Sequence, residues 1–147
     1  MKPWYKRAWL WLGEIGQRHT VGEDFGGDLV VQTQRGPVFI PYDFEYDRFT
    51  LAYDTEYPDL WSAAALHDYG YSREFIYGGN FRCREHWDSA FYDEMVRGAS
   101  RIRARLCHDG LCAEGKAEYD RLMKRARVYY YAVRALGGAV HWLSNRG

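Results

Sequence analysis

The sequence has no surplus of charge of either sign, since its 147 residues include 20 basic and 20 acidic side chains. Nucleic-acid-binding domains normally carry an excess of Lys and Arg on one face, so we expect no nucleic-acid partner. Long hydrophobic runs are also missing, and none approaches the ~20 residues that a membrane-spanning helix needs. A chain of this length is most simply one domain with a hydrophobic core of its own.

The apolar stretch nearest the first residue is short as well. Ala8–Leu12 is a run of five residues, whereas a secretory signal has an apolar region of about 7–15 residues. We therefore expect no signal peptide.

Cysteine is scarce, and the three cysteines cannot all pair within the chain. One interpretation is three reduced thiols in a reducing compartment. The other is a bond between Cys107 and Cys112 that closes a short loop and leaves Cys83 free.

The hydrophobic pattern predicts a mainly helical single domain with one small β-hairpin. Strand-like segments at Asp28–Thr33 and Pro37–Pro41 flank Arg35-Gly36, which is typical of a hairpin turn. We expect an amphipathic N-terminal helical arm at residues 1–20, the hairpin at 28–41, a loop rich in Asp and Tyr at 42–57 and a helical core at 58–138.

Within this core, proline, asparagine and glycine suggest where helices begin and end. We expect helices from Pro58 to about Tyr77, from Asn80 to about Val96 with a stop near Gly98, from Ser100 to Cys107 with a stop at Asp109-Gly110, and from Ala113 to Leu136 with a stop at Gly137-Gly138.

A histidine and an aspartate are spaced so that two of these helices bring them together. His67 lies 11 residues before Gly78, and Asp88 lies 9 residues after Gly79. At about 1.5 Å per residue, both lie about 14–16 Å from the same turn, so antiparallel helices place them at nearly equal height. A neutral imidazole whose tautomer is held by a carboxylate can take a proton from water. The simpler structural interpretation is a core histidine paired with a packing aspartate.

Three segments in order resemble the phospholipase A2 superfamily, and most closely its small prokaryotic branch. Ala65-Leu66-His67-Asp68-Tyr69-Gly70-Tyr71 is similar to the active-site helix, whose signature is His-Asp-x-x-Tyr. Asp88–Met95 is similar to the pattern Asp-x-x-Phe-x-x-x-Met, and Tyr129–Gly137 to the closing Tyr-Tyr-x-Ala-Val-x-x-Phe-Gly. The resemblance covers about Pro41–Gly138. The cysteine that the family has beside the catalytic helix is alanine here, which argues against a secreted, disulfide-rich member.

The resemblance implies a phospholipase A2-like fold and calcium-dependent hydrolysis of a phospholipid ester at a membrane surface. It implies that His67 deprotonates the attacking water, that Asp88 orients the imidazole, and that Tyr71 hydrogen-bonds the carboxylate of this dyad. A retained charged dyad favours an enzyme, because a scaffold has little physical need for a buried charge.

The resemblance also implies a calcium site formed by the 42–57 loop and the catalytic helix. Calcium prefers carboxylate and carbonyl oxygens. The loop offers Asp43, Asp47 and Asp54, and the family's position corresponds to Asp47, so the expected ligands are Asp47, the carbonyl of Arg48, and Asp68. The basic side chain of Arg48 departs from the family pattern.

Two other metal chemistries have weaker support. Cys83-x-x-His86 and Cys107-His108-x-x-x-Cys112 have zinc-like spacing, although thiols on a helix often simply pack. Phosphohydrolases of the His-Asp type need a further upstream histidine, and His19 lies in a glycine-rich segment rather than in a recognisable helix.

The chain also resembles an uncharacterised phage-borne domain family with the same motif, through Ile40–Phe44, Asp47 and the His-Asp helix. This second likeness implies a virion-associated or cytoplasmic protein, and it is compatible with a non-catalytic structural or binding role on the same scaffold. Trp4, Trp9 and Trp11 in the N-terminal arm suit a membrane interface or packing against the core or a phage or other protein partner.

Overall fold

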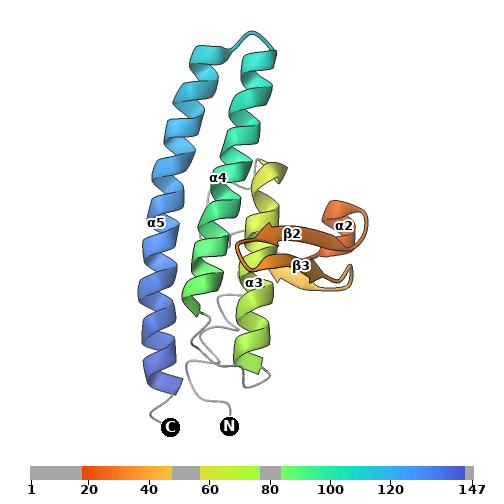
Figure 1. The fold of residues 1–147 in the computed structure, drawn as a ribbon, viewed down its shortest axis with the longest axis vertical. Helices are drawn as coiled ribbons and strands as arrows, with labels where there is room; N and C mark the ends of the chain where they lie inside the picture. Colours follow the sequence, from red (N-terminus) through yellow and green to blue (C-terminus); the bar gives the residue numbers. More distant parts are fainter. Residues whose placement is uncertain (1–17, 48–56, 77–83, 145–147) are drawn as a thin grey trace.

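In the computed structural model, the backbone is described for residues 18–47, 57–76 and 84–144, and the side chains for residues 19–46, 57–70 and 85–135. Long helices dominate this part of the chain: α3 (Trp61–Ile76), α4 (Arg84–His108) and α5 (Cys112–Ser144). Helices α4 and α5 run antiparallel, α3 lies beside the lower part of α4, and the upper part of the α4–α5 pair projects beyond α3 (Figure 1). The predicted mainly helical fold with a small hairpin is confirmed. No helix in the described ranges combines the length and the apolar character needed to cross a bilayer.

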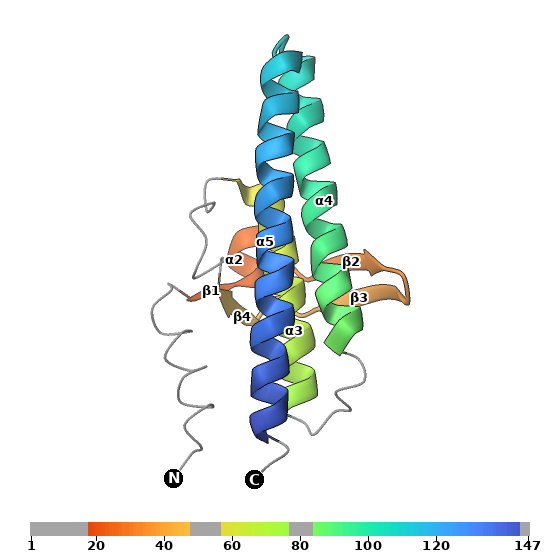
Figure 2. The ribbon, with the colours of Figure 1, turned by 90° about the vertical axis from the view of Figure 1, so that its left-hand side faces the viewer.

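The β-structure consists of two small antiparallel pairs. Strands β2 (Leu29–Thr33) and β3 (Gly36–Ile40) form the predicted hairpin, with Leu29 opposite Ile40 and Thr33 opposite Gly36. Gly36 has a φ of 105°, a conformation that L side chains rarely adopt, so glycine suits the end of this turn. The hairpin packs across α3 (Figure 1), while the second pair lies on another side of the helices (Figure 2).

The second pair corrects two sequence-based expectations. Strand β1 (Arg18–Thr20) pairs with β4 (Glu45–Asp47). Residues 18–20 are therefore not the end of a helical arm, and the 42–57 segment is not entirely a loop. Each of these strands has only three residues, which is too short for an alternating hydrophobic pattern to be recognised in the sequence. Each strand is stabilised by pairing with the other. The rest of the predicted arm, residues 1–17, lies outside the described residues.

A short helix, α2 (Val21–Phe25), follows β1 and was not predicted. The side chain of Thr20 accepts a hydrogen bond from the Glu23 backbone N–H and so caps its start. Gly26 ends it with a φ of 79°. The glycines that interrupt the sequence pattern here thus belong to a capped single turn, and Val21 itself is fully buried.

Two predicted helix ends are wrong, and at Gly98 the reason is packing. Helix α4 continues through Gly98 and includes the segment 100–107, and α5 continues through residues 137–138 to Ser144. A Cβ at Gly98 would lie 2.6 Å from the carbonyl oxygen of Asp59, so this glycine permits close contact with the start of α3. By contrast, the stop at Gly110 is confirmed, with a φ of 83°. A single 3-10 turn, η1 (Pro58–Leu60), leads into α3 as the proline indicated.

Small residues let α3 and α4 approach closely, and larger ones fill the seam between α4 and α5. A Cβ at Gly70 would lie 2.2 Å from the indole ring of Trp87, so the indole occupies the space above this glycine. Each fully buried leucine, such as Leu66 or Leu122, stabilises the fold by about 1.5–3 kcal/mol. The shared core of the three helices consists of Leu60, Ala63, Phe91, Met95, Ala99, Ile102, Leu122, Met123 and Ala126.

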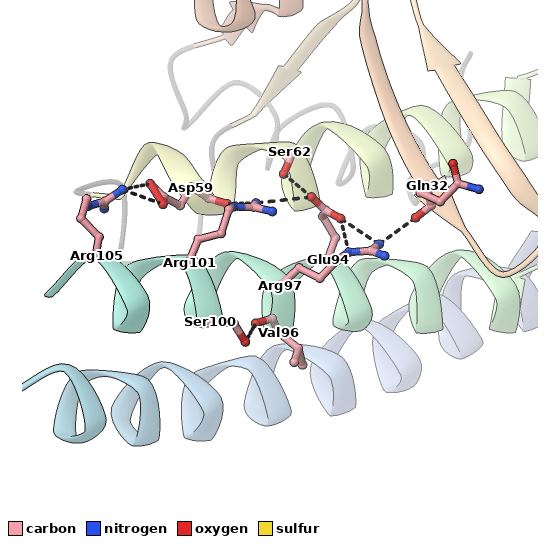
Figure 3. Close-up of polar contacts among 9 residues, drawn as sticks. All are labelled: Gln32, Asp59, Ser62, Glu94, Val96, Arg97, Ser100, Arg101 and Arg105. Atoms are coloured by element: carbon pink, nitrogen blue, oxygen red, sulfur yellow. Dashed lines mark hydrogen bonds and ion pairs between the residues drawn. The ribbon is translucent and has the colours of Figure 1, made fainter. Parts of the chain in front are cut away.

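A polar network around Glu94 joins α3, α4 and the hairpin (Figure 3). The Ser62 hydroxyl donates to Glu94 Oε1 at 2.8 Å, and Arg97 Nε donates to Glu94 Oε2 at 2.9 Å. Arg97 Nη2 also donates to the Gln32 carbonyl on β2, at 2.7 Å. Because the Glu94 side chain is only 9% exposed, these donors supply the hydrogen bonds that its buried carboxylate needs.

The same side of α4 carries two more arginines that reach the start of α3. Arg101 donates to the Asp59 carbonyl at 3.2 Å, and Arg105 contacts the Asp59 carboxylate at 3.0 Å (Figure 3). Both guanidinium groups are largely exposed, so water screens these contacts and each contributes little stability. They nevertheless favour one register of α4 against α3.

A disulfide between Cys107 and Cys112 closes the loop between α4 and α5. The interpretation with three reduced thiols is therefore wrong for this pair. A zinc site that uses these two sulfurs as thiolates is incompatible with the bond. Cys83 lies outside the described residues.

Replacing Glu94 with Gln should lower the free energy of unfolding by about 1–3 kcal/mol. An amide has only one acceptor oxygen and no negative charge, so it cannot accept the hydrogen bonds of both Ser62 and Arg97 as the carboxylate does. Urea unfolding of purified protein measures this change. Glu118→Gln is the matched control, since Glu118 also pairs with an arginine three residues later, Arg121, but its side chain is more exposed, at 22%. The control should change stability by no more than about 0.5 kcal/mol, and equal losses in both variants would contradict a special role for the Glu94 network.

Candidate functional site

The structure brings His67 and Asp88 into contact between α3 and α4. His67 Nε2 lies 3.3 Å from Asp88 Oδ1. The pair forms because α3 and α4 are antiparallel (Figure 1) and pack together, with the indole of Trp87 in the space above Gly70. The contact that the helical spacing predicted is confirmed, and the catalytic role of the two residues stays a prediction.

Asp88 is fully buried, at 0% exposure, and its second oxygen has a partner from α5. Arg134 Nη1 donates to Asp88 Oδ2 at 3.1 Å. Sequence reasoning missed this residue, although it lies in the Tyr129–Gly137 segment. The available signal was its position: Arg134 is eight residues after the buried Ala126, which places a basic residue on the apolar stripe of the last helix.

The contacts of Asp88 restrict how the imidazole can hydrogen-bond. An ionised carboxylate only accepts hydrogen bonds, and Arg134 supplies a cationic donor to it. When Nε2 of a neutral imidazole donates to Oδ1, the lone pair is on Nδ1. The ring of Phe91 packs against the imidazole with the centroids 4.9 Å apart, and this packing restricts rotation of the ring.

The Nδ1 side of His67 faces the neighbouring carboxylate. Nδ1 lies 4.0 Å from Asp68 Oδ1, which is too long for a direct hydrogen bond. The His67 side chain is 10% exposed and that of Asp68 is 32% exposed. Asp68 is therefore the more accessible of the two side chains.

The predicted calcium ligands are described only in part. Asp47 ends strand β4, which packs against α3, but its side chain lies outside the described residues, as do Arg48 and Asp54. Asp43 is described and is exposed. The donor type suits calcium, which takes six to eight oxygens. Among described side chains, however, no three His, Cys, Asp or Glu residues gather as a metal site. The Tyr71 side chain is likewise not described, although its backbone belongs to α3.

A hollow of about 210 Å³ lies away from the dyad, between the hairpin turn and the first turns of α4. Its walls include Arg35 from the turn and His86, Ser89 and Asp93 from one face of α4, and neither His67 nor Asp88 lines it. Burial lowers the pKa of His86 below 6.5, and the nearby Arg35 guanidinium lowers it further. His86 is therefore a neutral imidazole at pH 7. The other predicted zinc ligand beside it, Cys83, is outside the described residues.

A search for similar proteins found no family model, curated protein or solved structure that matches this chain.

The lowered pKa of His86 predicts an acid-sensitive contribution to stability. Because the unfolded state binds the proton more readily, this contribution is complete above about pH 6.5 and is lost as the pH falls through the folded-state pKa. His86→Gln should make the free energy of unfolding fall less steeply between pH 7 and pH 5, as measured by urea unfolding at each pH. His108→Gln, at the exposed end of α4, is the control. If the free energy of unfolding falls as steeply with decreasing pH in His86→Gln as in the wild type, the lowered pKa of His86 is contradicted.

Proposed function

We propose that this protein is a phospholipase A2-like hydrolase that cleaves a phospholipid carboxylic ester with calcium, using water activated by His67 and Asp88. The observation that carries the proposal is the 3.3 Å contact between His67 Nε2 and the fully buried Asp88, with Nδ1 on the side of the partly exposed Asp68. A base needs its lone pair toward the reactant and its other nitrogen held by an acceptor. The arrangement meets both needs, and the motif resemblance names the substrate class.

The proton transfers follow from this arrangement. A water beside Nδ1 attacks the ester carbonyl carbon while His67 takes its proton, and Asp88 stabilises the resulting imidazolium through Nε2–H. The imidazolium then returns the proton to the oxygen of the leaving alcohol as the carbon–oxygen bond breaks. The products are a fatty acid and a lysophospholipid, and the imidazole is neutral again.

Calcium would be held by Asp68, the Asp47 carboxylate and the Arg48 carbonyl. When bound there, it would supply positive charge for the lipid phosphate and for the oxyanion that develops on the carbonyl. Tyr71 would hydrogen-bond the Asp88 carboxylate and hold it in place. The N-terminal aromatic arm would bring the protein to the membrane surface.

The second candidate is a non-catalytic phage or prophage protein that keeps this scaffold for a structural or binding role. Its support is the burial of the imidazole, since only 10% of the His67 side chain is exposed. In that role, His67 and Asp88 would act only as a buried polar contact between two helices. A virion-associated or cytoplasmic location belongs to this proposal.

The enzyme proposal predicts calcium-dependent release of fatty acid from mixed phospholipid–detergent micelles. His67→Gln should lower kcat by about 10²–10⁴-fold, because it removes the general base, while the exposed control His108→Gln should retain wild-type turnover. Release of titratable fatty acid measures the rate. If wild-type protein releases no more fatty acid than His67→Gln does, the enzyme proposal fails.

Calcium binding can be tested without turnover. Calcium at a hundredfold above its dissociation constant should raise the melting temperature of the wild type by roughly 5–10 °C, since it binds only the folded state. Asp68→Asn should abolish most of this shift, and Asp109→Asn, in the loop between α4 and α5, should keep it. A melting temperature that is independent of calcium in the wild type would favour the non-catalytic scaffold.

A further inference from the structure

We propose that Arg134 is a positioning residue of this site: it holds the Asp88 carboxylate so that Oδ1 faces Nε2 of His67, and it thereby orients the imidazole. This inference rests on the proposed function for its kinetic consequence but not for its structural one. Nothing in the phospholipase-like motif assigns a role to this arginine.

The Asp88 carboxylate is held from two sides. Oδ1 faces His67 on α3 at 3.3 Å, and Oδ2 accepts from Arg134 on α5 at 3.1 Å. With one oxygen fixed by each helix, rotation of the carboxyl group would break both contacts. Arg134 therefore sets the direction in which Oδ1 presents its lone pair to the imidazole.

The charge of Arg134 is as important as its geometry. A carboxylate at 0% exposure is stabilised by a cationic donor within hydrogen-bond distance, and a neutral amide in its place would supply a weaker hydrogen bond. A weaker contact with Oδ2 would loosen the orientation of Oδ1 toward His67 Nε2.

A guanidinium suits this task better than an ammonium. Its side chain is 31% exposed, so it keeps part of its hydration while Nη1 reaches the buried oxygen. It stays charged at all relevant pH values, and its planar donors fix the direction of the hydrogen bond. Lysine at this position would preserve the charge and lose the direction.

The experiment compares Arg134→Gln and Arg134→Lys with Arg121→Gln. Arg121 is the matched control because it lies on the same helix, is 39% exposed and pairs with a carboxylate, Glu118, away from the dyad. The nitrogen shifts of the His67 imidazole, measured by NMR in calcium-free protein, report the hydrogen bond between Nε2 and Asp88. The kinetics of fatty-acid release from mixed micelles report the consequence for turnover.

We expect Arg134→Gln to weaken the hydrogen bond between His67 Nε2 and Asp88, seen as a change in the imidazole nitrogen shifts, and to lower kcat by about 10–100-fold with little change in KM, as loss of a supporting hydrogen bond typically does. Arg134→Lys should restore part of this hydrogen bond and part of kcat. Added guanidinium ion should raise the rate of Arg134→Gln and leave that of the control unchanged. Arg121→Gln should match the wild type in both measurements.

The outcomes separate this inference from the proposed function. If wild-type protein has no esterase activity, the proposed function fails, and the imidazole nitrogen shifts of His67 in the variants still decide the role of Arg134. A folded Arg134→Gln with wild-type imidazole shifts and wild-type kcat overturns the inference. Should that variant not fold, Arg134→Lys decides, because unchanged imidazole shifts with unchanged kcat would overturn the inference and a loss in both would support it.

Discussion

The structure depends on a carboxylate that is completely removed from water. Asp88 lies where three helices meet, and an isolated charge in such a place would be strongly unfavourable. Its two oxygens contact His67 on α3 and Arg134 on α5, residues that are 21 and 46 positions away in the chain. Helix packing and candidate chemistry therefore share one constraint, since any shift of α3 or α5 relative to α4 breaks a contact with a buried charge.

The surrounding structure reinforces this constraint at a distance. Ser62 and Glu94 form a second contact between α3 and α4, five residues before His67 and six after Asp88, which is the register expected of antiparallel helices. Arg97 links the same carboxylate to strand β2, so the hairpin is held to the helices by polar contacts as well as by its apolar face. Above this region α4 and α5 continue as a pair without α3 (Figure 1) and end at the loop closed by the disulfide. The dyad thus lies in the part of the molecule where a third helix covers the other two.

The proposed function rests on the resemblance of the motif and on the geometry of one dyad. The geometry favours chemistry over simple packing in one respect: Nδ1 of His67 faces a partly exposed carboxylate, Asp68, rather than the core. The burial of the imidazole favours the scaffold role. The two alternatives therefore differ in a physical property, the access of water and lipid to Nδ1, and not in the architecture of the helices.

The sequence alone determined the helical class, the β2–β3 hairpin and the contact of His67 with Asp88. Hydrophobic periodicity, turn residues and helical rise can all be recognised in short stretches of the sequence. Tertiary structure alone decided the rest. From the sequence alone, Gly98 predicts the end of a helix. Helix α4 nevertheless continues through Gly98, where the absence of a side chain allows close contact with the Asp59 backbone. Strands β1 and β4 exist only as each other's partners. In the sequence, Arg134 is one of several arginines on a predicted helix. It comes to lie beside Asp88 only when α5 folds back along α4, because contacts between residues far apart in the chain depend on how the helices pack.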